Sequence, residues 1–168
     1  GALEGRPARL GAGPSAGLTV LVTAPVLEQS TSPSYGGKPA VTVVVSTHGR
    51  ADLLAGLLGC LDNQDHLSFE VVVVDNGSTD STWRVLCLWL ATTQCNALGL
   101  RVGFHDGPAV PRNTALEHSS GPLVAFTDDD CLPSTRWLSA LTRAMTDGVA
   151  VVQGRTLPEA DGWAGPWG

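Results

Sequence analysis

The stretch VTVVVSTHGR, residues 41–50, decides the fold of this chain. Residues 41–46 form a continuous run rich in β-branched side chains, which is typical of a strand buried on both faces. Over residues 50–62 the pattern changes to leucines whose spacing places them along one side of a helix: Leu53, Leu54, Leu57, Leu58 and Leu61. A buried strand followed at once by an amphipathic helix predicts the start of a βαβ unit.

The same alternation continues along the chain. Further strands are predicted at residues 69–74, 98–104, 123–127 and 149–153, and further helices at 79–92, 111–118 and 134–146. This order predicts an α/β fold with a mostly parallel sheet, right-handed crossovers and helices on both faces. In such sheets ligands bind beyond the carboxyl ends of the strands, so the residues there should carry the chemistry.

Composition divides the chain into three parts. Residues 1–38 are rich in Gly, Ala, Pro and Ser and are predicted to be a flexible extension or linker, with a weak strand pattern at 18–26. Residues 39–157 form the predicted α/β domain. Residues 158–168 are rich in Gly, Pro and Trp, show no helical period and are predicted to be a tail or the start of a missing acceptor region.

Bulk properties exclude several classes of protein. The 168 residues are 43% hydrophobic and 15% charged, which is typical of one globular domain. The net charge of −6 argues against a nucleic-acid partner. No apolar run is long enough for an integral membrane segment. The four cysteines lack metal-binding spacing and are expected to be reduced thiols, so we expect a cytoplasmic protein, in solution or peripheral to a membrane.

Three successive aspartates, Asp128, Asp129 and Asp130, follow the predicted strand at 123–127. Their mutual repulsion raises carboxylate pKa values unless a cation neutralises them. Hard divalent ions prefer carboxylate oxygens and keep open positions for phosphate oxygens. The triplet therefore indicates Mn²⁺ or Mg²⁺ bridging the protein to a diphosphate. The alternative is a solvated acidic turn that caps the next helix.

Polar side chains also end two other predicted strands. Ser46 and Thr47 stand at the end of the first, and Asp75 and Asn76 at the end of the second, where Asn-Gly signals a turn. An Asp or Asn at that place can read the imide edge of a uracil or the hydroxyls of a ribose, or it can merely cap the following helix. Arg112 begins the helix at 111–118, where its guanidinium suits phosphate oxygens, unless it is a surface arginine.

Other strand-end chemistries lack their motifs. No G-x-G-x-x-G follows the first strand, as a dinucleotide fold would require. The only lysine, Lys38, precedes that strand, so neither a Walker A loop nor the late-strand lysine of a phosphoryl-accepting receiver domain is present. A nucleotidyltransferase of related fold would require a Gly-rich basic loop after the first strand, and only Gly49 and Arg50 match that pattern. The four histidines are unclustered and are expected to be structural or exposed, with His48 as the exception because it lies at a strand end.

Four segments, residues 41–50, 71–82, 107–116 and 123–138, together resemble the family 2 glycosyltransferases of the GT-A fold. Their order and spacing fit that family over roughly residues 39–157. The resemblance implies a Rossmann-like nucleotide-sugar-binding domain and an enzyme that transfers a sugar, with inversion, from a UDP- or GDP-linked donor to an acceptor that the sequence does not name.

The resemblance also implies roles for individual residues. Ser46 and Thr47 would line the nucleotide pocket, Asp75 and Asn76 would face the base or ribose, and Arg112 would lie near the diphosphate. The aspartate triplet resembles the D-x-D element of the family. In it Asp130 would bind the metal most directly, Asp128 would be a second ligand, and Asp128 or Asp129 would lie near the ribose and phosphates. The metal would act as a Lewis acid on the departing diphosphate.

Two departures from the family pattern leave alternatives open. The family usually has Asn where Gly49 stands, so one pocket contact is in doubt. The family also places its acceptor site and catalytic base well beyond the D-x-D element, whereas Glu159 and Asp161 are the only tail carboxylates and neither is assigned as the base. We therefore expect either a glycosyltransferase whose acceptor half is missing from this chain or very short, or a truncated nucleotide-sugar-binding module without its own catalytic base. Such a module would hold nucleotide without turnover or would need a partner to supply the base. A nucleotidyltransferase of related fold is a third hypothesis.

Overall fold

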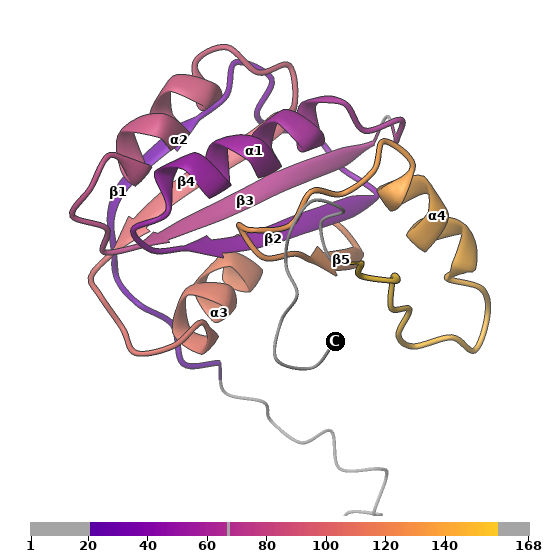
Figure 1. Cartoon of the computed structure of the whole chain (residues 1–168). Helices are drawn as coiled ribbons and strands as arrows, with labels where there is room; N and C mark the ends of the chain where they lie inside the picture. Colours follow the sequence, from indigo (N-terminus) through magenta and orange to yellow (C-terminus); the bar gives the residue numbers. More distant parts are fainter. Residues whose placement is uncertain (1–20, 67, 158–168) are drawn as a thin grey trace, which may run out of the picture.

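The computed structural model describes residues 21–66 and 68–157, which build one five-stranded sheet flanked by helices (Figure 1). The strand order is β1-β4-β3-β2-β5. The strands are β1 (Val26–Thr31), β2 (Val41–Thr47), β3 (Phe69–Asn76), β4 (Asn96–Val102) and β5 (Leu123–Phe126). Strands β2 to β5 run parallel, and β1 lies antiparallel to β4 at one edge. The predicted mostly parallel α/β sheet is confirmed.

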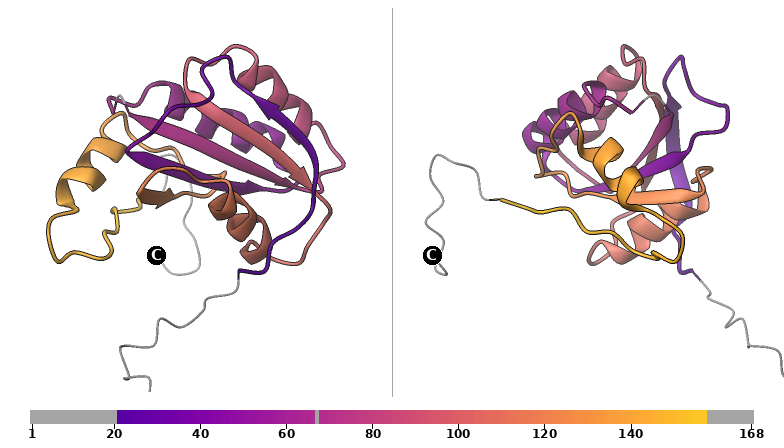
Figure 2. Two further views of the ribbon diagram at one scale, coloured as in Figure 1. Left: turned by 180° about the vertical axis from the view of Figure 1, so that it is seen from behind. Right: turned by 90° about the vertical axis from the view of Figure 1, so that its right-hand side faces the viewer.

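Helices cover both faces of this sheet (Figures 1 and 2). They are α1 (Ala51–Asp62), α2 (Thr82–Leu90), α3 (Ala109–Glu117) and α4 (Trp137–Ala144). Leucines of α1 and α2, together with Leu138 of α4, bury against one face, and Ala115 of α3 packs on the other. Each buried leucine contributes about 1.5–3 kcal/mol relative to an exposed one, so these helices are held by packing.

Alternation along β2 and β3 explains why the sequence reads as unbroken apolar runs. Val43 and Val45 face α1 and α2, whereas Val44 faces α3. Residues 71–74 of β3 alternate in the same way, and all four are fully buried. Both faces therefore demand apolar side chains, as in other sheets with helices on both sides.

The segment before β2 differs from its prediction as a linker. Residues 26–31 form β1, with Val26 beside Val102 and Thr31 beside Leu98 of β4. Four of the six residues are exposed, so β1 carries no apolar run that would reveal it in the sequence. The weak strand pattern at 18–26 points just ahead of this strand, and its residues 18–20 lie outside the described part, as do the rest of residues 1–20 and the predicted tail at 158–168.

The predicted strand at residues 149–153 is wrong. These residues adopt no regular structure, and Val149 and Val151 are 38% and 82% exposed. A strand needs a neighbour to satisfy its backbone groups, and no strand within residues 21–157 pairs with this segment. In the same part of the chain, no helix has the length and apolar character needed to cross a membrane.

Candidate functional site

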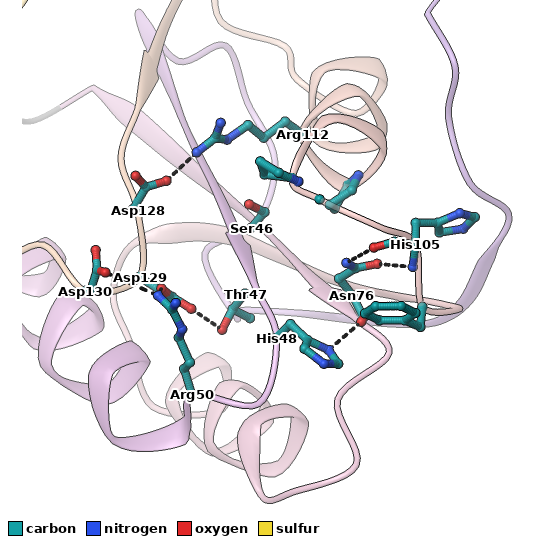
Figure 3. A pocket seen from close by; sticks show the side chains of 14 residues that line it. Ser46, Thr47, His48, Arg50, Asn76, His105, Arg112, Asp128, Asp129 and Asp130 are labelled. Carbon is teal, nitrogen blue, oxygen red and sulfur yellow. Dashed lines mark hydrogen bonds and ion pairs between the residues drawn. The ribbon is translucent and has the colours of Figure 1, made fainter.

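A polar pocket opens where the carboxyl ends of β2, β3 and β5 meet (Figure 3). The chain runs from β2 to β3 and β4 in one direction and then returns to place β5 on the other side of β2, so the strand order reverses there. Such a switch point is the usual ligand site of an open α/β sheet. The cavity measures ≈ 480 Å³ and is lined by Ser46, Thr47, His48, Arg50, Asn76, Phe104, His105, Gly107, Pro108, Pro111, Arg112, Asp128, Asp129 and Asp130.

Asp129 is the most enclosed of the three aspartates, with 4% of its surface exposed. Its Oδ2 accepts a hydrogen bond of 2.7 Å from the Thr47 hydroxyl, and its Oδ1 lies 3.0 Å from Nη1 of Arg50. A buried carboxylate requires such partners. Asp129 therefore ties the start of the β5–α4 loop to the end of β2.

Asp128 and Asp130 point more openly toward the pocket. Their side chains are 57% and 50% exposed. Asp128 pairs with the Arg112 guanidinium, and Oδ2 of Asp130 lies 3.2 Å from Nη1 of Arg50. Because both partners are partly exposed, these pairs are weak and can be exchanged for another ligand.

The electrostatics of this end of the pocket are mixed rather than purely acidic. The hydrogen bond and charge of Asp129 raise the pKa of the Arg50 guanidinium, with a smaller contribution from Asp130. Two arginines and three aspartates thus interleave in one cavity. This arrangement can hold both a cation, on carboxylate oxygens, and a diphosphate, on guanidinium groups.

The geometry of Asp130 and Asp128 is compatible with the metal binding that the sequence predicts for them. Across the described ranges, no three His, Cys, Asp or Glu side chains gather as a preformed metal cage. Mg²⁺ in nucleotide sites commonly takes only one or two protein carboxylates, with water and phosphate oxygens as its other ligands. Two half-exposed carboxylates at the rim of a pocket suit that mode.

Asp75 and Asn76 are separated by the alternation of β3. Asn76 lines the pocket, whereas Asp75 does not. Asp75 is fully buried; its Oδ1 accepts a hydrogen bond from the backbone N–H of Ser78, and its Oδ2 lies 3.5 Å from Nε of Arg101. Of the seven predicted substrate-binding residues, the structure thus gathers six around one cavity, and Asp75 is buried outside its lining.

The structure adds pocket residues that the sequence reasoning missed. The sequence associates Arg50 only with a partial match to a basic loop, and it predicts Phe104 as part of the third strand. Both residues line the pocket. In the structure β4 ends at Val102, so Phe104 and His105 belong to the loop that follows. His48, which the sequence had singled out by its strand-end position, packs its ring 4.9 Å from that of Phe104.

Comparison with known proteins agrees with this architecture. The chain is 34% identical over 102 residues to glycosyltransferase AglE of Haloferax volcanii, covering 60% of this chain and 33% of AglE. It is 32% identical over 124 residues to the GalNAc(5)-diNAcBac-PP-undecaprenol β-1,3-glucosyltransferase of Campylobacter jejuni, covering 74% and 40%. The chain therefore spans well under half the length of these relatives.

Solved structures share the fold. Mannosyltransferase PcManGT of Pyrobaculum calidifontis, in complex with GDP-Man and Mn²⁺, aligns with a TM-score of 0.59 and 33% identity over 71% of this chain and 35% of its own. S. aureus TarS in complex with UDP-GlcNAc aligns with a TM-score of 0.59 and 28% identity over 67% and 37%. The sheet is thus that of GT-A glycosyltransferases.

A sequence model for the family described as "Glycosyl transferase family 2" matches residues 42–167. This match covers both the strand ends that build the pocket and the aspartate triplet. The chain therefore belongs to glycosyl transferase family 2.

Proposed function

We propose that this chain is the donor-binding part of a metal-dependent, inverting glycosyltransferase that takes a UDP- or GDP-linked sugar. The observation that carries the proposal is the interleaving of Arg50 and Arg112 with three aspartates in one pocket at the switch point of the sheet. This combination of charges suits a diphosphate bound together with a divalent cation. The complexes of PcManGT with GDP-Man and of TarS with UDP-GlcNAc support the ligand class.

Each charged group has a distinct proposed role. Asp130, assisted by Asp128, would hold Mn²⁺ or Mg²⁺, which when bound supplies Lewis-acid stabilisation to the leaving diphosphate. Arg112 would turn from Asp128 to the diphosphate and neutralise the charge that grows there as the bond to the sugar breaks. Asp129 would stay with Thr47 and Arg50, which holds the loop that carries the other two aspartates. Ser46 would offer its hydroxyl to the nucleotide from the end of β2.

A second candidate, a nucleotide-sugar-binding module that needs a partner or further chain for catalysis, also has an observation in its favour. All three carboxylates that line the pocket are paired with arginine in the described structure, so none of them stands ready as a general base for an acceptor. In this candidate the general base would come from a partner or from further chain.

Calorimetric titration of UDP- and GDP-sugars, with Mn²⁺ and with EDTA, tests the proposal. We expect binding that strengthens with Mn²⁺ and loses this metal dependence in Asp130→Ala. Asp147→Ala, an exposed acidic residue outside the pocket, is the matched control and should bind as the unaltered chain does. Failure to bind either nucleotide class, or metal dependence that survives in Asp130→Ala, contradicts the proposed site.

Turnover separates the two candidates. The chain is incubated with the nucleotide-sugar that it binds, and the nucleoside diphosphate released is measured over time. Metal-dependent release above the rate of Asp130→Ala supports the enzyme. Tight binding without release supports the module.

A further inference from the structure

We propose that Phe104 forms the surface on which the nucleobase of the donor stacks, and that Asn76 and Gly77 hold Phe104 in place. The inference rests on the proposed function, which requires a nucleoside diphosphate in the pocket. It goes further because it assigns the base end of that ligand to a loop residue and gives Asn76 a positioning role instead of a reading role.

The pocket has two chemically different ends (Figure 3). In that view the three aspartates and Arg50 lie on one side, His48, Asn76 and His105 lie on the other, and Ser46 and Thr47 stand between them. A nucleoside diphosphate has the same polarity, with a charged diphosphate at one end and a flat base at the other. If the diphosphate lies among the arginines and aspartates, the base reaches the end where Phe104 lines the cavity.

Phe104 is suited to stacking by its exposure and its neighbour. It is 59% exposed although it is large and apolar, and its ring centroid lies 4.9 Å from that of His48 at an interplanar angle of 51°. An exposed aromatic face gains free energy when a flat ligand covers it. Nucleobases bind proteins in this way irrespective of their hydrogen-bonding edges, because every base has a π-face.

Asn76 fastens the loop that carries Phe104. Its Oδ1 accepts a hydrogen bond of 2.9 Å from the His105 N–H, and its Nδ2 donates one of 2.8 Å to the His105 carbonyl. The Asn76 side chain thus makes two hydrogen bonds with the backbone of His105, the residue after Phe104. Because both ends of the side-chain amide form hydrogen bonds with the loop, the inferred role of Asn76 is to hold Phe104 in place.

Gly77 and His48 complete the support. Gly77 has φ +70°, and a Cβ at this position would lie 2.6 Å from the backbone N of Phe104, so only glycine permits this approach of the loop to the end of β3. Nδ1 of His48 lies 2.8 Å from the Asn76 carbonyl oxygen, which can only accept, so Nδ1 carries the proton. This bond fixes the imidazole against the Phe104 ring.

Stacking on Phe104 should raise the affinity for nucleotides without distinguishing one base from another. Titrations with UDP, GDP and inorganic pyrophosphate, all with Mn²⁺, should show that Phe104→Ala weakens both nucleotides about tenfold and leaves pyrophosphate unchanged. Phe104→Tyr should restore nucleotide binding, since it keeps the aromatic face. Leu88→Ala is the matched control, because Leu88 on α2 is also 59% exposed and lies outside the pocket.

The role of Asn76 is tested by coupling. Asn76→Ala should weaken UDP binding as Phe104→Ala does, and the double variant should be no weaker than either one, because both changes remove the same stacking surface. Additive losses would show that Asn76 touches the nucleotide independently. Thermal unfolding of each variant without ligand excludes a simple loss of fold.

The outcomes separate the two proposals. Unchanged UDP and GDP affinity in Phe104→Ala, or an equal loss of pyrophosphate binding, overturns the stacking role and leaves the proposed function standing. If the unaltered chain binds pyrophosphate but neither nucleotide, the donor proposal itself fails, and the stacking role fails with it. One-dimensional NMR provides a direct readout, since the base protons of bound UDP should shift upfield with Phe104 or Tyr at this position and not with Ala.

Discussion

Arg50 and Asp129 form an ion pair in which Nη1 and Oδ1 lie 3.0 Å apart, although the arginine side chain is 50% exposed and that of the aspartate only 5%. The pair joins the residue just before α1 to the loop after β5, elements 79 residues apart in the chain. Thr47 completes it by donating to the other carboxylate oxygen. Adjacent aspartates that look equivalent in the sequence therefore differ in their surroundings: Asp129 is buried and held by Arg50 and Thr47, whereas Asp128 and Asp130 are half exposed at the pocket.

This difference in burial predicts that two neighbouring substitutions change stability by different amounts. Asp129→Ala should lower the free energy of unfolding by about 2 kcal/mol, because it leaves the buried Thr47 hydroxyl without its acceptor. Asp130→Ala should change it by less than about 0.5 kcal/mol, since that side chain is half exposed and its ion pair is weak. Urea denaturation in EDTA measures both. Equal losses in the two variants would contradict this prediction.

Because Asp128 forms an ion pair with Arg112, we expect Asp128→Asn to change pyrophosphate affinity in opposite directions with and without metal. In EDTA, Asp128→Asn should strengthen pyrophosphate binding about two- to fivefold, because it frees Arg112 and removes a negative charge beside the anion. With Mn²⁺ the same variant should weaken binding, because a metal ligand is lost. Calorimetry under both conditions decides the matter, with Asp147→Asn as control. A change of the same sign in both conditions would exclude a shared role for Asp128.

Much of the fold was predictable because buried elements have periodic sequences. Strands β2 to β5 and all four helices follow the predicted alternation, with ends that shift by a few residues. β1 could not be found in this way, since it is held by backbone hydrogen bonds to β4 and exposes most of its side chains. The run at 149–153 shows the reverse error, because a β-branched pattern alone does not supply a neighbouring strand.

The site was predictable where it depends on strand ends and less so where it depends on loops. Ser46, Thr47, Asn76 and the aspartates lie in the pocket because parallel strands end at one edge. The two-residue period of β3 could have separated Asn76 from Asp75, since adjacent residues face opposite sides of a sheet. Phe104 left no comparable signal, because its place depends on the contact between its loop and Gly77.

We expect substitution of Glu70, which lies outside the pocket lining, to lower the stability of the fold. It is buried at 3% exposure, and its Oε1 accepts hydrogen bonds of 2.6 Å from both the Thr42 hydroxyl and the Ser120 N–H, while its Oε2 accepts one from the Ser120 hydroxyl. Glu70→Gln would turn an amide donor toward these donors, so we expect a loss of about 2 kcal/mol by urea denaturation. Glu117→Gln, on the exposed side of α3, should change stability by less than about 0.5 kcal/mol. Similar losses in both variants would show that the network contributes little.

We expect the chemical reactivity of the Cys95 thiol to depend on pH. Burial raises the pKa of its thiol, opposed by the hydrogen bond with Thr93 and reinforced by the charge of Asp62. Iodoacetamide should therefore modify Cys95 more slowly in the native chain than in the unfolded chain at pH 8, and the native rate should rise only at higher pH, because the thiolate is the reactive form. Peptide mass spectrometry at several pH values follows the modification at this site. Equal native and unfolded rates would contradict a raised pKa.

The same raised pKa fixes how stability should vary with pH. The native thiol holds its proton more tightly than the unfolded one, so its contribution is fully present below the unfolded thiol pKa, about 8.5. It should be lost as the pH rises from there through the native pKa. The difference in unfolding free energy between the unaltered chain and Cys95→Ala should therefore shrink between pH 8 and pH 10. A difference that stays constant over this range would mean that Cys95 contributes through packing alone.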